Sequence, residues 1–139
     1  MMDWRECFRK KVVKEVGEDA GLIASLLKTS ENKLKSSEKL DLSEETAASK
    51  LSLAYDSLRE LLEALALKKG YKIYNHECYA AFLREVLNKG EKAEEFDEIR
   101  KIRNGVNYYG KEILAEETRE IIKRIKSLRE FTLELLSKL

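Results

Sequence analysis

The stretch AASKLSLAYDSLRELLEALALKKG occupies residues 47–70 and decides the fold class. Its apolar residues recur at intervals of three and four, which places them on one face of an α-helix: Ala47, Leu51, Ala54, Leu58, Leu61, Leu62 and Leu65. Before it, Ser43-Glu44-Glu45-Thr46 supplies a capping residue and an acidic first turn, and Gly70 supplies a left-handed stop. The spacing therefore predicts one amphipathic helix of about seven turns.

The segments before and after this helix in the sequence have similar apolar spacing, and some carry more charge. They predict further helices over about 3–16, 19–40, 76–89, from 93 to 105 or beyond, and 115–139, with Gly17 and Gly90 as stops. Residues 71–75 are expected to form a short extended connection without a partner strand. Long amphipathic helices joined by short turns favour an all-α, up-and-down bundle of four or five helices. We expect one domain, in which residues 1–17 form an extra N-terminal helical segment and residues 19–139 form the bundle.

The composition limits the function classes. Lys and Arg number 27 against 26 Asp and Glu, which gives a net charge of +1 and argues against a strongly basic DNA-coating protein. Hydrophobic residues make up 43% of the chain, so disorder from low hydrophobicity is excluded. The chain is rich in Lys and Glu and has no proline or glutamine. This composition is typical of heat-adapted proteins.

The sequence also predicts a location. The N-terminus lacks the apolar stretch of a signal peptide, and no uncharged apolar run approaches the roughly 18 residues of a membrane helix. Cys7 and Cys78 are the two cysteines, and in an unexported chain they are expected to be free thiols in a reducing compartment. We therefore expect a cytoplasmic protein that does not contact membranes.

Several common kinds of site are excluded by the residue inventory. The glycines form neither of the usual nucleotide-binding loops, and a single histidine excludes zinc sites that need two or three. His76 and Cys78 are two residues apart, about 200° around a helix, so they would not bind one ion together. The carboxylates of residues 94–98 are expected to form a solvated helix face. The sequence therefore predicts no metal and no cofactor.

The segment IRKIRNGVNYYG, residues 99–110, breaks the local pattern. Arg103 stands four residues after Ile99 and seven after Phe96, which places it beside the apolar stripe. A buried charge without a partner costs several kcal/mol, so Arg103 must find a partner or line a cleft. Asn107 shares its face if the helix continues. The alternative interpretation is a simple helix end, with a turn at Asn104-Gly105 and tyrosines that pack in the core.

These residues resemble a known signature. Arg103-Asn104 followed by Tyr108-Tyr109-Gly110 resembles the R-N-x-x-x-[H/Y] motif of HEPN domains, the "higher eukaryotes and prokaryotes nucleotide-binding" superfamily. Residues 53–60 are similar to the second bundle helix of that family, and residues 69–72 with 75–77 are similar to its loop and next helix start. The resemblance covers about residues 19–139 and is closest to small stand-alone archaeal members.

The resemblance implies a HEPN-like helical bundle that dimerises and brings two copies of the motif to one cleft. Many members are metal-independent ribonucleases, often the toxin of a toxin–antitoxin pair with a small nucleotidyltransferase. In them the arginine contacts phosphate and the histidine transfers a proton. This chain has Tyr108 at the histidine position, and a phenol with a pKa near 10 is a poor base at neutral pH. We therefore expect ribonuclease activity to be weakened or absent.

The sequence thus assigns a candidate site and its alternatives. Arg103 and Tyr108 are the candidate catalytic residues, His76 is a candidate auxiliary residue, and the candidate phosphate- or ligand-binding residues are Arg103, Asn104, Asn107, Tyr109, Arg100 and Lys101. The expected function is RNA or nucleotide binding by a homodimer, as the ribonuclease-derived subunit of a HEPN and nucleotidyltransferase pair. The alternative is a non-catalytic docking subunit for a nucleotidyltransferase or another protein. The last helix also carries a row of Arg119, Lys123 and Lys126, which is either an anion-binding row or a solvated face.

Overall fold

The computed structural model describes residues 1–139, and most of the chain is helical. The helices are α1 (Trp4–Arg9), α2 (Ala20–Lys39), α3 (Ala47–Lys68), α4 (Glu77–Ala81), α5 (Gly90–Tyr108) and α6 (Ala115–Ser137). Two short strands, β1 (Val13–Glu15) and β2 (Tyr71–Ile73), form a small sheet, and a π-helical turn over Phe82–Val86 follows α4. The prediction of a mostly helical chain is confirmed.

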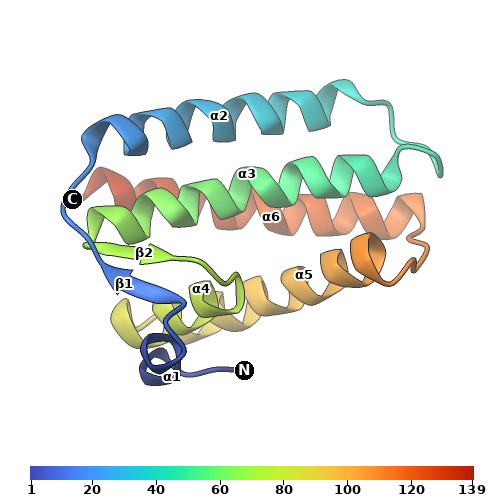
Figure 1. Cartoon of the computed structure of the whole chain (residues 1–139). Coiled ribbons are helices and arrows are strands. Elements are labelled where there is room, and N and C mark those ends of the chain that lie inside the picture. Colours follow the sequence, from blue (N-terminus) through green and yellow to red (C-terminus); the bar gives the residue numbers. More distant parts are fainter.

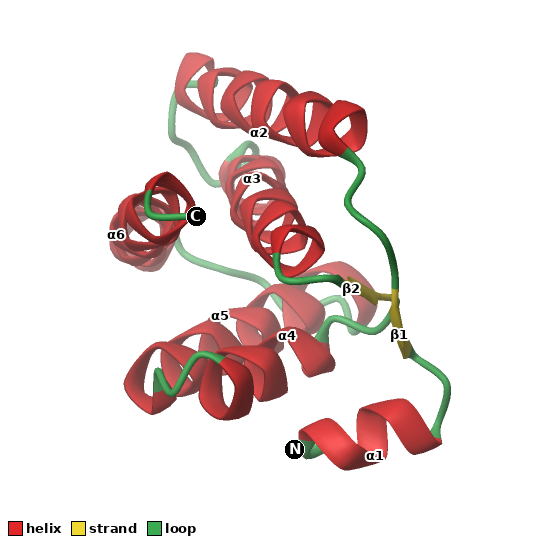
Figure 2. Ribbon diagram, turned by 90° about the vertical axis from the view of Figure 1, so that its left-hand side faces the viewer, coloured by secondary structure: helices red, strands yellow, loops and turns green.

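The four long helices α2, α3, α5 and α6 alternate in direction along the chain (Figure 1). Helix α3 lies at the centre, with α2 on one side and α6 and α5 on the others (Figure 2). Its predicted apolar residues are all buried: Ala47, Leu51, Ala54, Leu58, Leu61, Leu62 and Leu65. Burying a leucine side chain contributes about 1.5–3 kcal/mol, so the face that decided the fold class also stabilises the core.

The start of α2 and the end of α3 form as the sequence predicts. The predicted acidic first turn of α3 is wrong, because α3 begins at Ala47 and residues 43–46 form a turn before it. The Asp19 carboxylate accepts a hydrogen bond of 3.0 Å from the amide of Leu22 at the start of α2. Before α3, the Ser43 hydroxyl accepts from the Thr46 amide at 3.2 Å, and the Thr46 hydroxyl accepts from the Ser43 amide at 3.0 Å. After α3, Gly70 takes a φ of +93°, which a residue without Cβ adopts at little cost.

The prediction of one helix over residues 3–16 is wrong. Helix α1 ends at Arg9, and the chain then forms β1, which pairs antiparallel with β2 in the register Val13↔Ile73, Lys14↔Lys72 and Glu15↔Tyr71. The expectation that residues 71–75 have no partner strand is wrong for the same reason. Val13 and Ile73 are buried while Lys14 is exposed, so the alternation of a half-buried strand outweighs helix propensity.

Two further boundaries differ from the prediction. Residues 76–89 are helical only to Val86, as α4 and the π-helical turn, and Asn88 has a φ of +55°. Gly90 begins α5 instead of ending the preceding helix. Asn is one of the few residues that enter the left-handed region readily, which explains why the stop falls there. The prediction that this helix reaches Gly105 or beyond is confirmed, because α5 ends at Tyr108.

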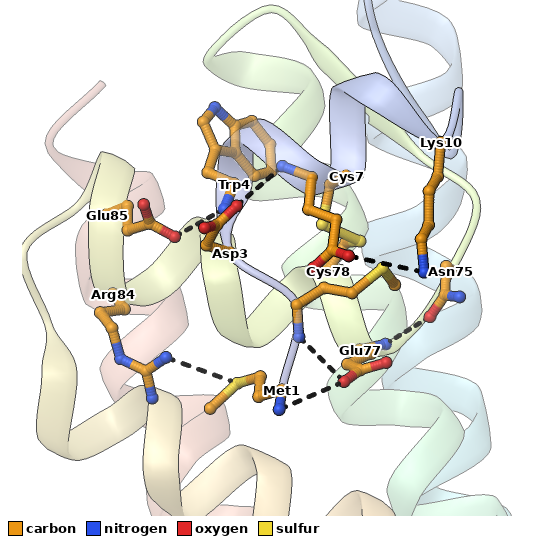
Figure 3. The surroundings of a disulfide bond; sticks show 12 residues. Met1, Asp3, Trp4, Cys7, Lys10, Asn75, Glu77, Cys78, Arg84 and Glu85 are labelled. Carbon is orange, nitrogen blue, oxygen red and sulfur yellow. Dashed lines mark hydrogen bonds and ion pairs between the residues drawn. A yellow bond between two sulfur atoms is a disulfide. The ribbon is translucent and has the colours of Figure 1, made fainter.

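The N-terminal segment is attached to α4 by a disulfide bond between Cys7 and Cys78, and no cysteine is free. The expectation of two free thiols is therefore wrong, and it no longer supports a reducing compartment. Figure 3 shows further attachments around the bond, in which the amide of Met2 donates to Glu77 at 3.0 Å and the amide of Trp4 donates to Glu85. Trp4 also packs against Phe8, Tyr71 and Phe82. None of the helices is both long and apolar enough to cross a membrane.

Candidate functional site

Arg103 on α5 is held between two aromatic rings. Its side chain is 10% exposed, and its guanidinium carbon lies 4.8 Å from the centre of the Tyr55 ring and 5.1 Å from that of Tyr108. Tyr55 belongs to α3 and is fully buried, whereas Tyr108 is 65% exposed. Such cation–π contacts are worth about 0.5–2 kcal/mol each. The guanidinium is thus fixed on a rigid inner ring and covered by a ring that faces solvent.

The positive charge of Arg103 is only weakly compensated. One terminal nitrogen donates to the Tyr108 hydroxyl at 3.0 Å and to the Asn104 side-chain oxygen at 3.3 Å. The nearest carboxylate, Asp56, lies 3.9 Å from the other terminal nitrogen, and the buried Nε has no hydrogen-bond partner. Since its closest partners are neutral, Arg103 retains a charge that an anion can satisfy.

Two neighbouring arginines are compensated more closely. Arg100 lies 2.8 Å from Asp97, and Arg59 lies 2.9 Å from Glu63. Lys101, also predicted for the site, pairs with the second oxygen of Asp97 at 3.3 Å. Arg103 is therefore the cation of this cluster with the longest distance to a carboxylate.

His76 lies at the hydroxyl end of Tyr55, whereas Arg103 lies over the ring. The Nδ1 of His76 lies 3.0 Å from the Tyr55 hydroxyl, so the phenol lies between the imidazole and Arg103. Burial, followed by the charges of Arg59, Arg103 and Arg100, lowers the pKa of His76 to about 4. Burial also raises the pKa of the Tyr55 phenol. At neutral pH the pair is therefore uncharged, and one hydrogen bond joins the phenol to the imidazole.

The remaining predicted residues lie at the end of α5. Asn107 accepts a hydrogen bond of 3.0 Å from Ser52 of α3, one helical turn from Asp56, so Asn107 and Arg103 share a face as the spacing predicts. Tyr109 follows the last residue of α5 and is 77% exposed. The interpretation of both tyrosines as core residues is therefore wrong. Asn104-Gly105 is not a turn, because α5 continues to Tyr108.

Arg103 does not line the surface cavity of about 330 Å³ beside α5, which is lined by Lys101, Ile102, Val106 and Ile113 among others. In the row on α6, Arg119 pairs with Glu116, Lys123 with Glu120 at 3.4 Å and Lys126 with Glu38 at 3.3 Å, which favours the solvated-face interpretation. No group of three or more His, Cys, Asp or Glu residues is placed to hold a metal ion.

Sequence reasoning missed the contribution of α3 to this site. Tyr55, Asp56 and Arg59 surround Arg103 and His76, but none was singled out in the sequence. A signal was present, because Ser52, Asp56, Arg59 and Glu63 recur at intervals of three and four and so form a polar stripe on an otherwise apolar helix.

Comparison with protein-family models, curated proteins and solved structures finds no match to this chain. The functional interpretation therefore depends on what the side chains can do. A guanidinium binds two phosphate oxygens, and an exposed phenol or amide donates a hydrogen bond. These are the groups needed to bind a phosphate ester at Arg103.

Proposed function

We propose that this protein is a HEPN-type RNA- or nucleotide-binding protein in which Arg103 contacts a phosphate. The observation that carries the proposal is the arginine itself, nearly buried between Tyr55 and Tyr108 with its closest carboxylate 3.9 Å away. A structural arginine in such a position normally has a close carboxylate partner, as Arg129 illustrates with Glu31 at 3.2 Å. A phosphate would approach from the solvent side, where Tyr108 lies, and would replace the hydroxyl of Tyr108 as the partner of the guanidinium.

The same geometry supports binding more than rapid cleavage. Tyr108 occupies the position of the motif histidine, and its phenol hydrogen-bonds Arg103 as an acceptor. The single imidazole has its Nδ1 engaged by the buried Tyr55. General acid–base catalysis requires a titrating group within hydrogen-bond distance of the reacting proton. We therefore propose a ribonuclease-derived site in which catalysis is weakened or absent.

The test is equilibrium binding of a random-sequence single-stranded RNA to the wild type and to Arg103→Ala. Loss of a charge-assisted contact is expected to weaken binding by about tenfold or more. Arg124→Ala is the matched control, because it removes an equal charge from α6, where Arg124 forms an exposed ion pair with Glu98 of α5. Equal RNA affinity of the wild type and Arg103→Ala would contradict the proposal.

A docking function is the second candidate, and the apolar exposure at the end of α5 favours it. Tyr108, Tyr109 and Leu114 are all more than half exposed and lie beside the cavity lined by Ile102 and Val106. We propose that this surface pairs with a second copy in a homodimer or docks a small nucleotidyltransferase. Light scattering of the wild type and of Tyr109→Ser tests the dimer, and a monomer at micromolar concentration would remove it.

A further inference from the structure

The outward face of the β1–β2 sheet carries an unusual set of side chains. Val13 and Ile73 point into the core, so the alternating side chains of Lys14 and Lys72 point outward. Tyr74 follows β2, and its amide donates to Val12 at 2.8 Å, which continues the ladder by one residue. The Tyr74 ring is 55% exposed, with the ammonium groups of Lys14 and Lys72 at 5.7 and 6.0 Å from its centre.

This arrangement has a cost for folding. Lys14 and Lys72 are directly opposite each other in the register, and like charges at opposed positions destabilise a sheet. Lys72 is relieved by Glu63 at 2.6 Å, whereas no carboxylate forms an ion pair with Lys14. Natural proteins keep such unfavourable charge placements mainly where a surface has a function. An exposed ring flanked by ammonium groups is suited to a nucleobase and its phosphates.

Helix α3 contacts both the sheet face and Arg103. Its Glu63 contacts Lys72, and its Asp56 contacts Arg103. These two carboxylates are seven residues apart, on one face of the helix. Seven residues correspond to about 10 Å along the helix axis. The sheet lies beside this part of α3 (Figure 1). A single strand of several nucleotides is therefore a suitable ligand for both Arg103 and the sheet face.

We propose that Lys14, Lys72 and Tyr74 form a second contact surface for single-stranded RNA, with a base stacked on Tyr74 and backbone phosphates at the two lysines. This inference rests on the proposed function and specifies its ligand as an oligonucleotide. Stacking on an aromatic side chain accepts any base, so the surface adds affinity without sequence preference. Lys14 supplies most of the electrostatic contribution, because Glu63 already neutralises Lys72.

The experiment compares binding of two probes by calorimetry: a random-sequence single-stranded RNA of about ten nucleotides and uridine monophosphate. Tyr74→Leu is expected to weaken binding of the oligonucleotide by about fivefold or more and to leave uridine monophosphate unaffected, and Tyr74→Phe is expected to bind both like the wild type. Lys14→Ala is expected to weaken binding of the oligonucleotide and to lower the slope of its salt dependence by about 0.7. Lys35→Ala, an exposed lysine on α2, is the matched control and should change neither.

A stability measurement separates function from folding. Because Lys14→Ala removes the opposed like-charge pair, its melting temperature at low salt should rise by about 1–4 °C while its RNA affinity falls. Oligonucleotide binding by Tyr74→Leu and Lys14→Ala at wild-type affinity would overturn the inference. If only Arg103→Ala weakens RNA binding, the proposal of a second surface is wrong and the Arg103 site stands. If only the Tyr74 and Lys14 variants weaken RNA binding, the Arg103 site is wrong and the second surface stands. Absence of wild-type binding would overturn both.

Discussion

The guanidinium of Arg103 on α5 packs on the ring of Tyr55 on α3, with its carbon 4.8 Å from the ring centre. The hydroxyl of the same tyrosine lies 3.0 Å from Nδ1 of His76. A buried phenol therefore connects the single imidazole of the chain to the arginine of the candidate site. The ring supports the guanidinium, and the hydroxyl hydrogen-bonds the imidazole, so the two groups of this side chain have separate roles.

Substitutions of Tyr55 separate these two roles. Tyr55→Phe keeps the ring and loses the hydrogen bond to His76, so stability should fall by about 1 kcal/mol while RNA affinity stays at the wild-type value. Tyr55→Leu removes the cation–π contact and should lower both. Chemical denaturation and RNA titration measure the two quantities. Loss of RNA affinity by Tyr55→Phe as large as that of Tyr55→Leu would contradict this division.

The titration of His76 reports on the arginines around it. Its pKa in the folded state is lowered to about 4, mainly by burial and further by Arg59, Arg103 and Arg100, against about 6.5 in the unfolded chain. Its contribution to stability is therefore complete above about pH 6.5 and is lost as the pH falls toward 4. Because it is the single histidine, an NMR titration of its ring protons gives one curve. The titration midpoint of His76 should rise in Arg103→Ala and stay unchanged in Arg124→Ala. A wild-type midpoint near 6.5 would show that His76 is neither buried nor close to these arginines.

Tyr108 is expected to limit catalysis. Tyr108→His supplies a group that accepts and returns a proton near pH 7, and general acid–base assistance contributes about 10²–10⁴-fold. The variant should therefore cleave RNA without metal faster than the wild type does. Gel-based cleavage assays in the presence of a chelator measure the rate.

Tyr108→Phe is the control for this prediction. It keeps the ring over Arg103 and removes the hydroxyl that accepts from the guanidinium. Weaker RNA binding with an intact fold would assign the phenol to ligand recognition. Rapid cleavage by the wild type that Tyr108→Phe matches would show that this position does not limit the reaction, and His76 would then be the next residue to replace.

The disulfide between Cys7 and Cys78 closes a sequence separation of 71 residues. Removing a native disulfide costs about 2–5 kcal/mol in small domains, so a reducing agent should lower the unfolding free energy by about that amount. The double variant Cys7→Ser, Cys78→Ser should show the same stability with and without the reducing agent. Detection of two reactive thiols in the denatured, unreduced protein would contradict the bond.

The sequence predicted the long helices because their stability depends on local periodicity and caps. Asp19 and Gly70 mark ends that the structure places where expected. It failed over residues 3–16, because β1 forms only by pairing with β2, and a contact between residues so distant leaves no local pattern. The disulfide was missed for the same reason, since α1 and α4 meet only in the folded chain.

The candidate site divides in a similar way. The position of Arg103 beside the apolar stripe of α5 predicted that it needs a partner or a cleft, and Asn107 was correctly placed on its face. The ring of Tyr55, on which the guanidinium packs, belongs to another helix, and in the sequence Tyr55 looks like a core residue. His76 could be named as an auxiliary residue, but its contact with Tyr55 follows from the packing of α3 against the start of α4.

The central claim is that Arg103 contacts a phosphate, and the salt dependence of RNA binding tests it most directly. Each phosphate contact contributes about 0.7 to the slope of log affinity against log salt for a single strand. Arg103→Ala should reduce this slope by about that amount and lower the affinity at every salt concentration, whereas Arg124→Ala should leave the slope unchanged. A slope and affinity in Arg103→Ala equal to those of the wild type would contradict the account.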